Sequence, residues 1–412
     1  MRRLSRPIVT WIVLVVSVIL LFQPRVRLFL GIFQKSNSSS LRTMTTTPAT
    51  YPYAKELEIA TLAVKRASIL TKKLSDSIAN TRSSGTQIKD DKSPVTIGDY
   101  AAQAIINRAI KLNFPNDEIV GEEDSTDLKT DKANGGSLNE KILEIIAEAQ
   151  KETGSANSKV GTLSELETVW KSIDFGNSKG GSQGRFWALD PIDGTKGFLR
   201  GDQFAVCLAL IENGKVVLGV IGCPNLPEII VSNDSTSGQV GGLYSAIVGV
   251  GSYYTPLFQN DGFVPLENQE RIHMKQRSSP DELVVVEGVE KGHSSHSTQS
   301  RIKQKLGFNP DTVSKQTINL DSQVKYCVLA KGQADIYLRL PISDTYREKI
   351  WDHAAGNVLV TESGGVVGDI NGNELDFSKG RLLESKGVIA ANKAVFKTVI
   401  RAVDGVLNTP HA

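Results

Sequence analysis

The sequence predicts a chain of mixed α+β and α/β class, in which a larger N-terminal sheet-and-helix domain precedes a smaller α/β domain. Two long segments, residues 54–78 and 98–114, carry apolar residues at helical spacing. Residues 204–254 then change to a period of two, which is typical of antiparallel strands. Beyond about residue 275, short apolar strands alternate with helical segments, as they do in α/β domains.

These changes of pattern divide the chain into three parts. Residues 1–50 form an N-terminal extension, residues 51–275 the larger domain and residues 276–412 the smaller one. A chain of 412 residues is long enough for two ordinary domains. Its 47 Lys and Arg residues nearly balance 45 Asp and Glu residues, so it lacks the strongly basic character of nucleic-acid-binding proteins. We therefore expect a small or compact partner and no nucleic acid.

The N-terminal extension differs from the rest, because it is rich in Arg and Ser and no acidic residue occurs before Glu56. Three interpretations remain open. The apolar run Ile8–Phe22 fits a membrane anchor, although it is shorter than the roughly twenty residues that span a bilayer. The composition also fits a mitochondrial presequence. Alternatively, translation begins at Met44, and we then expect a cytoplasmic protein, with mitochondrial or membrane-anchored location through residues 1–43 as the alternatives.

The three cysteines, Cys207, Cys223 and Cys327, stand singly in apolar stretches and form no C-x-x-C pair. This spacing predicts reduced thiols buried in the core, with no disulfide framework and no metal-binding role.

The elements of the larger domain follow from local signals. After the helix at 54–78 and a polar loop at 81–92, the second helix is expected at 98–114, with Asp99 in its first turn. The charged segment 123–159 reads as an insertion that carries one helix, at 138–150. Two strand pairs follow, one around the Asn-Gly turn at 213–214 and one over 241–254.

The smaller domain begins with a buried strand in the segment 282–290. The expected elements after it are helices at 298–308 and 322–333, a strand at 334–341, and a helix from Trp351 that two glycines, Gly364 and Gly365, bring to an end.

The segment Asp190-Pro-Ile-Asp-Gly-Thr195 carries the clearest chemical signal. Mg²⁺ prefers carboxylate and carbonyl oxygens. If Pro191 ends the preceding strand and bends the chain, Asp190, the carbonyl of Ile192 and Asp193 face one point. Gly194 and Thr195 would then begin a short helix whose free N–H groups receive a phosphate. Two divalent cations held this way activate a water and stabilise a leaving oxygen.

This segment has two other interpretations. Asp, Pro and Gly are ordinary turn residues, so a plain β-turn followed by a helix N-cap fits as well. Phosphatases of the haloacid dehalogenase type place two aspartates two residues apart, on one face of a strand end. The spacing here is three and includes Pro191, which argues against a covalent aspartyl-phosphate enzyme.

Three more acidic residues are candidates for the same site. Glu122 follows an apolar run in Val-Gly-Glu-Glu-Asp, Asp352 opens a predicted helix in Trp-Asp-His-Ala-Ala-Gly, and Asp99 stands in Ser-Pro-Val-Thr-Ile-Gly-Asp-Tyr. Taken singly, each is an ordinary loop or helix-start residue.

Taken together, these motifs resemble those of the lithium-sensitive, magnesium-dependent phosphomonoesterase superfamily that includes inositol monophosphatase and fructose-1,6-bisphosphatase. Longer stretches, such as "FWALDPIDGTKGFLRGDQFAVCLALI", "GVEKGHSSHS", "LDSQVKYC" and "EKIWDHAAGNV", are similar to the fungal 3'(2'),5'-bisphosphate nucleotidases of sulfate assimilation and salt tolerance. The resemblance runs from about Ala54 to the C-terminus. It implies the layered α/β/α/β/α sugar-phosphatase fold.

The resemblance also implies residue roles. Two or three Mg²⁺ ions per site would be held by Glu122, Asp190, the Ile192 carbonyl, Asp193 and Asp352. Thr195, paired with Asp99, would activate the attacking water. The phosphate and nucleotide would be bound by Gly194, Thr195, His293, Ser322, Lys325 and Arg339.

The implied reaction removes the 3'-phosphate of 3'-phosphoadenosine 5'-phosphate to give AMP, with 3'-phosphoadenosine 5'-phosphosulfate as a further substrate. Lithium and sodium inhibition and a monomeric state are expected on the same ground. Two alternatives were kept: an inositol polyphosphate 1-phosphatase, and a nucleotide-binding sensor without catalysis. The second is disfavoured because all the metal and relay positions are filled.

Overall fold

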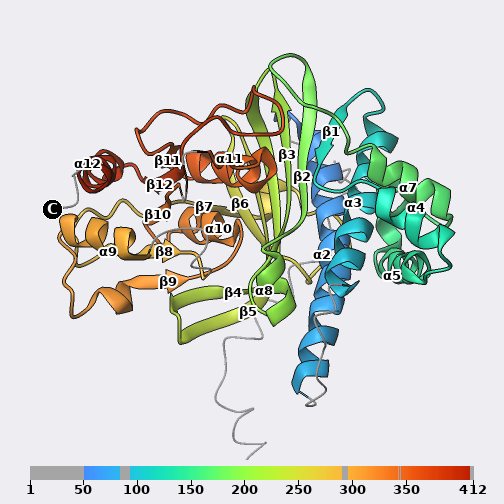
Figure 1. The fold of residues 1–412 in the computed structure, drawn as a ribbon, viewed down its shortest axis with the longest axis horizontal. Coiled ribbons are helices and arrows are strands. Elements are labelled where there is room, and N and C mark those ends of the chain that lie inside the picture. The colour runs from blue at the N-terminus through green and yellow to red at the C-terminus, as the bar shows by residue number, and fades with distance from the viewer. Residues whose placement is uncertain (1–50, 84–92, 290–295, 342, 344, 409–412) are drawn as a thin grey trace, which may run out of the picture. The chain divides into compact units, whose positions relative to one another are not determined.

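The structure of the protein is a computed structural model that describes residues 51–83, 93–289, 296–341, 343 and 345–408. Two β-sheets and the helices around them make up this part of the chain (Figure 1). One sheet has seven strands in the order β1-β2-β3-β4-β5-β6-β7, and the other has five in the order β11-β12-β10-β8-β9. The predicted mixed α/β class is confirmed.

The seven-stranded sheet follows the order of the chain. Its strands are β1 (Glu118–Gly121), β2 (Arg185–Asp193), β3 (Ala205–Glu212), β4 (Lys215–Ser232), β5 (Ser235–Ile247), β6 (Gly251–Pro256) and β7 (Glu270–Ile272). β1 pairs with β2 in parallel, and the other neighbours are antiparallel. Asn213 and Gly214 both have positive φ, 50° and 77°, which suits the tight turn between β3 and β4. The predicted hairpin and the second strand pair, β5 and β6, are confirmed.

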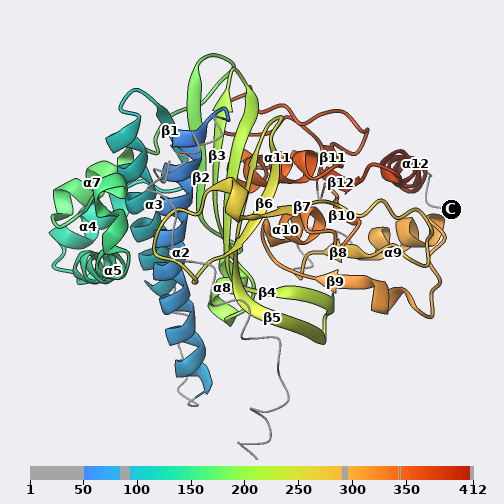
Figure 2. The same ribbon diagram turned by 180° about the vertical axis from the view of Figure 1, so that it is seen from behind.

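Two long helices, α2 (Ala54–Ser83) and α3 (Ser93–Asn113), cover one face of this sheet (Figure 2). Both helices were predicted, but α3 begins at Ser93 rather than Gly98. Proline is tolerated in the first turn of a helix, so Pro94 fits this earlier start. The expectation that Asp99 lies in the first turn is therefore wrong.

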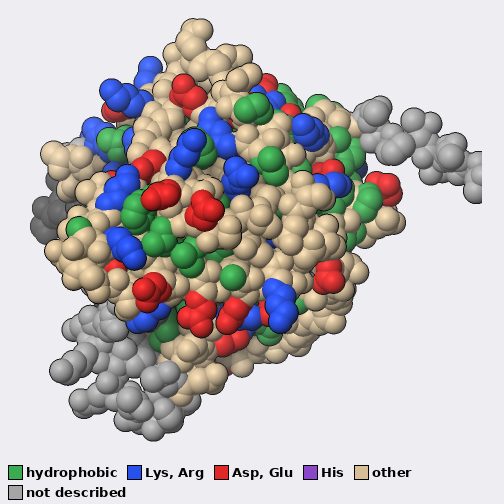
Figure 3. Space-filling model, turned by 90° about the vertical axis from the view of Figure 1, so that its right-hand side faces the viewer, with side chains coloured by type: hydrophobic (Ala, Val, Ile, Leu, Met, Phe, Trp, Pro, Cys, Tyr) green, Lys and Arg blue, Asp and Glu red, His purple; other side chains and the backbone are tan. Residues whose placement is uncertain are grey.

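The segment after Glu123 folds into more helices than the single one expected. It contains α4 (Thr126–Ala133), α5 (Leu138–Glu152), η1 (Gly154–Ala156) and α6 (Asn157–Val160), and α7 (Leu166–Asp174) follows. The buried guanidinium of Arg66 on α2 fastens it by donating to Thr153 Oγ1 at 2.6 Å and to Asn157 Oδ1 at 2.7 Å. Acidic and basic side chains are interspersed on this side of the molecule (Figure 3), in keeping with the balanced composition.

The second sheet contains β8 (Val285–Glu287), β9 (Thr317–Asn319), β10 (Ile336–Arg339), β11 (Gly365–Gly368) and β12 (Val388–Asn392). Between the two sheets lie α10 (Val324–Ala330) and α11 (Ala354–Glu362), whereas α9 (His296–Lys305) and α12 (Phe396–Leu407) pack on the outer face of the second sheet. With α2 and α3 on the far side, the layers run α/β/α/β/α, as expected. Short 3-10 turns complete the fold: η2 (Leu266–Asn268), η4 (Val313–Gln316) and η5 (Ile350–Asp352).

The change from one sheet to the other lies between Ile272 and Val285, close to residue 275. However, the core between the sheets contains side chains of both, such as Ile221 and Val286. The division into two domains at residue 275 therefore stays a prediction. Among the described residues, no helix combines the length and the apolar character needed to cross a bilayer.

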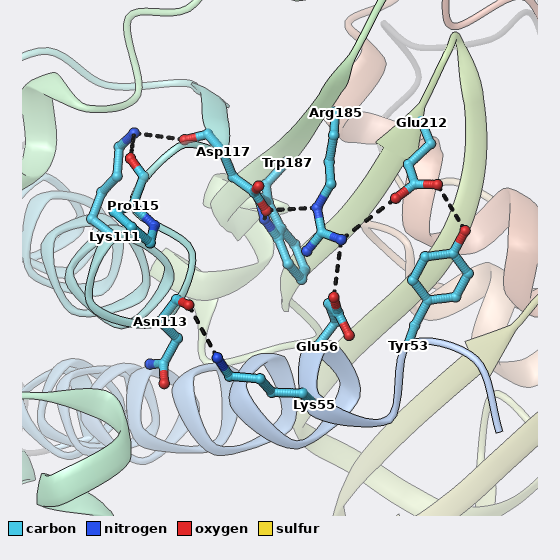
Figure 4. Close-up of polar contacts among 10 residues, drawn as sticks. All are labelled: Tyr53, Lys55, Glu56, Lys111, Asn113, Pro115, Asp117, Arg185, Trp187 and Glu212. Atoms are coloured by element: carbon cyan, nitrogen blue, oxygen red, sulfur yellow. Dashed lines mark hydrogen bonds and ion pairs between the residues drawn. The ribbon is translucent and has the colours of Figure 1, made fainter. Parts of the chain in front are cut away.

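A cluster of charged side chains fastens the start of α2 to the first sheet (Figure 4). The guanidinium of Arg185 lies 2.8 Å from Asp117 Oδ2, 2.9 Å from Glu56 Oε1 and 3.5 Å from Glu212 Oε1. Trp187 Nε1 donates to Asp117 as well, at 2.8 Å. One arginine thus compensates three carboxylates in a half-buried place.

Replacing Arg185 with methionine is expected to lower the free energy of unfolding by about 2–3 kcal/mol, because the three carboxylates would lose their cation while they stay near one another. Urea denaturation would measure this loss. The matched control is Lys129→Met, which removes an exposed pair with Asp174 and is expected to cost less than about 1 kcal/mol. Equal losses in the two variants would contradict the prediction.

Candidate active site

A cavity of about 320 Å³ opens where the end of β2 meets α8 (Thr195–Arg200), α10 and η5. Two groups of lining residues differ in chemistry. The acidic group contains Glu122, Asp190, Asp193 and Asp352, together with Ile192. The basic group contains Lys325 and Arg339, and Gly194, Thr195 and Ser322 line the same cavity. Segments far apart in the sequence therefore bring ten of the predicted site residues to one cavity.

The turn at Asp190–Thr195 differs in one respect from the prediction. β2 does not end before Pro191 but continues to Asp193, with a shift of register against β3 between Asp190 and Asp193. This irregularity supplies the bend, and a proline is tolerated at such a position. The predicted short helix, α8, begins at Thr195.

Gly194 is required where it stands, for two reasons. Its φ of 89° lies in the left-handed region that favours glycine. A Cβ at this position would also lie only 2.9 Å from Ser322 Cβ. The acidic turn and the start of α10 therefore approach each other closely at Gly194.

Helix α3, which carries Asp99, packs directly on this turn. A Cβ at Gly98 would lie 2.7 Å from Ile192 Cδ1, so the absence of a side chain there permits the contact. Farther along α3, the buried amide of Gln103 donates to Glu123 O at 2.6 Å and accepts from Glu123 N at 3.0 Å. The same helix thus contacts both the turn at Ile192 and the backbone of Glu123, which is next to Glu122.

The acidic residues are crowded enough to hold protons that isolated carboxylates would release. Burial, followed by the charges of Glu122, Asp193 and Asp352, raises the pKa of Asp190 well above its usual range. Burial and the charge of Asp193 also raise the pKa of Glu122; because this side chain is open to solvent, we assign the larger effect to the charge. Burial, followed by the charge of Asp193, raises the pKa of Asp352 well above its usual range.

This arrangement fits a hard divalent cation. Asp190 Oδ1 is buried and has no hydrogen-bond partner among the described residues, an arrangement that is costly without a ligand. A divalent cation would both occupy this oxygen and offset the repulsion among the carboxylates. The oxygen-only donor set, four carboxylates and the Ile192 carbonyl, suits Mg²⁺.

Asp352 lies in η5, one turn before α11, and not in the first turn of the helix as predicted. It also groups with Glu348 and His353, whose ligand atoms lie within 4.8 Å of one another. Each of those two side chains is engaged through one atom, and their remaining atoms, Glu348 Oε2 and His353 Nε2, lie 3.4 Å from each other. His353 Nδ1 is 2.7 Å from Tyr326 Oη, and Glu348 accepts from Arg339 Nε at 2.6 Å. Asp352 is therefore the member of this group that fits a cation ligand, and His353 is a structural neighbour in contact with Tyr326.

The basic group of the cavity consists of two cations, the buried Lys325 and the half-buried Arg339. Burial lowers the pKa of Lys325 to about 8, and its ammonium donates to Ser322 O at 2.6 Å. Arg339 is held by Glu348; although burial alone would raise the pKa of Glu348, its contacts with His353 and Arg339 lower it to about 2. Because burial lowers the pKa of His353 as well, its ring is neutral near pH 7, and Arg339 is the charge that keeps Glu348 ionised.

Two predicted residues are not among the described residues that line the cavity. His293 lies outside the described residues. Asp99 is 7% exposed and does not line the cavity, although its charge acts on Asp190. In the described part of the chain no hydrogen bond joins Asp99 to Thr195, whose hydroxyl lies 3.5 Å from Ile192 O. The Thr195–Asp99 relay therefore stays a prediction.

Several residues around the cavity were missed by sequence reasoning. Glu348 stands four residues before Asp352, inside a quoted motif, and a glutamate so close to a candidate ligand was a usable signal. Gln323 donates its backbone N–H to Asp193 Oδ2 at 2.5 Å and its side-chain amide to Trp351 O at 2.7 Å. The predicted free thiols are confirmed as buried, yet Cys223 Sγ and Cys327 Sγ lie 3.6 Å apart, a closeness that no local pattern indicates.

The metal-free protein is expected to lose stability as the pH rises from about 5 to 8. Groups with raised pKa values bind protons more tightly in the folded state, so their contribution is complete below the unfolded pKa and lost above it. For Glu123, burial and the charge of Glu122 raise the pKa from 4.5 to about 7. The contribution of Glu123 to stability is therefore lost between about pH 4.5 and pH 7. Thermal unfolding at several pH values would measure the slope. Glu123→Gln should flatten it, and Mg²⁺ should reduce it because cations compete with protons; a wild-type slope of opposite sign would contradict the prediction.

Comparison with known proteins agrees with this geometry. The model of the inositol monophosphatase family matches residues 54–407. A Candida albicans protein named 3'(2'),5'-bisphosphate nucleotidase 2 is 70% identical over 358 residues, which cover 87% of this chain and 99% of that protein. The 3'(2'),5'-bisphosphate nucleotidase of Emericella nidulans is 48% identical over 368 residues, which cover 86% and 99%. An inositol monophosphatase structure from Zymomonas mobilis has a TM-score of 0.52 at 17% identity, covering 86% of this chain and 100% of that one, and so supports the fold alone.

Proposed function

The chain belongs to the inositol monophosphatase family, and on this basis we propose that it is a 3'(2'),5'-bisphosphate nucleotidase. The reaction is hydrolysis of the 3'-phosphate of 3'-phosphoadenosine 5'-phosphate, which gives AMP and phosphate; 3'-phosphoadenosine 5'-phosphosulfate is a further substrate. The main support for the proposal is the 70% identity to the Candida albicans 3'(2'),5'-bisphosphate nucleotidase 2, over 99% of that protein's length. The cavity supports it, because it joins an acidic cation site to a basic phosphate site.

The cation of the proposed enzyme is Mg²⁺, held by Glu122, Asp190, Asp193, Asp352 and the Ile192 carbonyl. When bound, it supplies electrostatic stabilisation of the charge that develops on the phosphate oxygens and favours ionisation of the attacking water. Asp99 and Thr195 take the proton of that water, Thr195 through its hydroxyl and Asp99 as the final acceptor. The N–H groups at the start of α8 face the reacting phosphate.

The basic residues of the cavity are assigned to the phosphate that does not react. Lys325 and Arg339 are cations at neutral pH, and the planar guanidinium of Arg339 is suited to bind two phosphate oxygens. Glu348 holds that guanidinium in one orientation. His293, from the segment before α9, is proposed as a further contact. A role in sulfate assimilation and salt tolerance, and a cytoplasmic location, belong to the same proposal.

Phosphate release by the purified chain would test this function. We expect faster release from 3'-phosphoadenosine 5'-phosphate than from inositol 1,4-bisphosphate, and loss of both after removal of Mg²⁺ with a chelator. Preference for the inositol ester would instead indicate an inositol polyphosphate 1-phosphatase. Nucleotide binding without phosphate release would indicate a sensor that has lost catalysis.

A further inference from the structure

Arg381 lies between β11 and β12, outside every motif that the sequence analysis identified. Its guanidinium donates to three backbone carbonyls: Gly121 O at 2.5 Å, Ser178 O at 3.0 Å and Gly176 O at 3.2 Å. It also stacks on the ring of Trp351, 4.7 Å from the ring centroid. The side chain is half-buried, and these partners all belong to other segments of the chain.

These contacts join the two segments from which two of the proposed cation ligands emerge. Gly121 ends β1 and is followed at once by Glu122. Trp351 immediately precedes Asp352, and the backbone N–H of Ile350 donates to Arg381 O at 3.1 Å. Arg381 therefore holds the segment before Glu122 with its guanidinium and the segment before Asp352 with its backbone and its stacking contact.

We propose that Arg381 is a positioning residue of the cation site, which fixes the separation between the Glu122 and Asp352 carboxylates. A planar guanidinium can reach three carbonyls and a ring face at once, whereas a lysine ammonium cannot reproduce this set of contacts. The inference rests on the proposed cation-dependent function, because it assigns a role toward the same ligands.

The positioning role and a purely electrostatic role predict opposite results. Arg381 adds a positive charge near Glu122, and four carboxylates already repel one another in the cavity. If charge were its contribution, removing it would tighten cation binding, and Arg381→Lys would leave binding unchanged. If positioning is its contribution, both Arg381→Lys and Arg381→Met weaken binding, because the two carboxylates lose their fixed separation.

Isothermal titration of Mg²⁺ into the metal-free full-length chain tests the inference without any measurement of turnover. We expect Arg381→Met to weaken Mg²⁺ binding about tenfold or more, and Arg381→Lys to weaken it by a smaller factor. The control is Arg301→Met, which removes a contact with Val406 O at 3.4 Å between α9 and α12. This control should bind Mg²⁺ as the wild type does.

Wild-type affinity in Arg381→Lys, or tighter binding in Arg381→Met, would overturn the inference while leaving the proposed function intact. A wild-type chain that binds no Mg²⁺ would overturn the proposed function and the inference together. If Arg381→Met does not fold, as judged by urea denaturation, the result for Arg381→Lys decides alone, because the lysine retains the charge and the aliphatic packing.

Discussion

Replacing Asp190 with asparagine is expected to lower Mg²⁺-dependent phosphate release by about 10³-fold and, at the same time, to stabilise the metal-free protein. The loss follows from removal of a carboxylate that the proposed cation needs, since several kcal/mol of transition-state stabilisation correspond to about three powers of ten. The stabilisation has a different cause. Burial and repulsion by Glu122, Asp193 and Asp352 make the ionised Asp190 carboxylate unfavourable in the folded protein when no cation is present. We expect a gain of about 1–2 kcal/mol at pH 8.

Thermal unfolding with and without Mg²⁺ would measure both the stability of the metal-free protein and its stabilisation by the cation. Without Mg²⁺ the variant should melt above the wild type, and saturating Mg²⁺ should reverse the order, because only the wild type gains the full binding energy. Asp76→Asn is the control, since it neutralises an exposed aspartate that pairs with Lys72 on α2. It should change neither property. A metal-free Asp190→Asn protein that melts below the wild type would show that the acidic cluster is not strained.

Much of the fold could be predicted from the sequence, because the patterns that indicate its helices and turns are local. The two long helices show apolar spacing over several turns, and the turn at Asn213 and Gly214 shows the residues that a tight hairpin requires. The first and last residues of the helices and strands were predicted less accurately than the elements themselves. The start of α3 was missed because the residues around Ser93 carry no apolar period, so only the proline that follows marked it.

The acidic residues that line the cavity could also be predicted from the sequence, but the contacts that support them could not. Asp190, Asp193 and Asp352 stand in motifs whose residue types match one chemistry. Arg381 and Gln323 act through backbone carbonyls and N–H groups of distant segments, and a carbonyl leaves no trace in the sequence. Support of this kind becomes visible only when the fold brings the segments together.

The insertion after Glu123 shows the same limit on a larger scale. Its charged composition indicated one helix, whereas the structure contains α4, α5 and α6 with a 3-10 turn between them. One of its anchors is Arg66, which is buried and bonded to neutral oxygens of Thr153 and Asn157, with no carboxylate partner among the described residues. A buried arginine with only neutral partners has no charge pattern by which it could be found.

The second large effect is expected at Asp99. Asp99→Asn should lower kcat by about 10²- to 10⁴-fold, the usual contribution of a general base, while leaving Mg²⁺ affinity within about threefold of the wild type, because Asp99 does not line the cavity. Burial and then the charges of Glu123 and Glu122 raise the pKa of Asp99 well above its usual range, so the wild-type rate should rise with pH as this group ionises. The asparagine variant should lack that dependence. Stopped-time phosphate assays from pH 5 to 9, with Mg²⁺ titrations beside them, would measure both properties.

Because no hydrogen bond joins Asp99 to Thr195 in the structure, the relay needs a test of coupling between the two. Thr195→Val removes the hydroxyl and Thr195→Ser retains it, so the serine variant is the matched control. If Asp99 accepts the proton through Thr195, the double variant Asp99→Asn with Thr195→Val should lose no more activity than the worse of the two single variants. Multiplied losses would mean that the two side chains act separately, and Asp99 would then serve the reaction through the charge that it places beside Asp190.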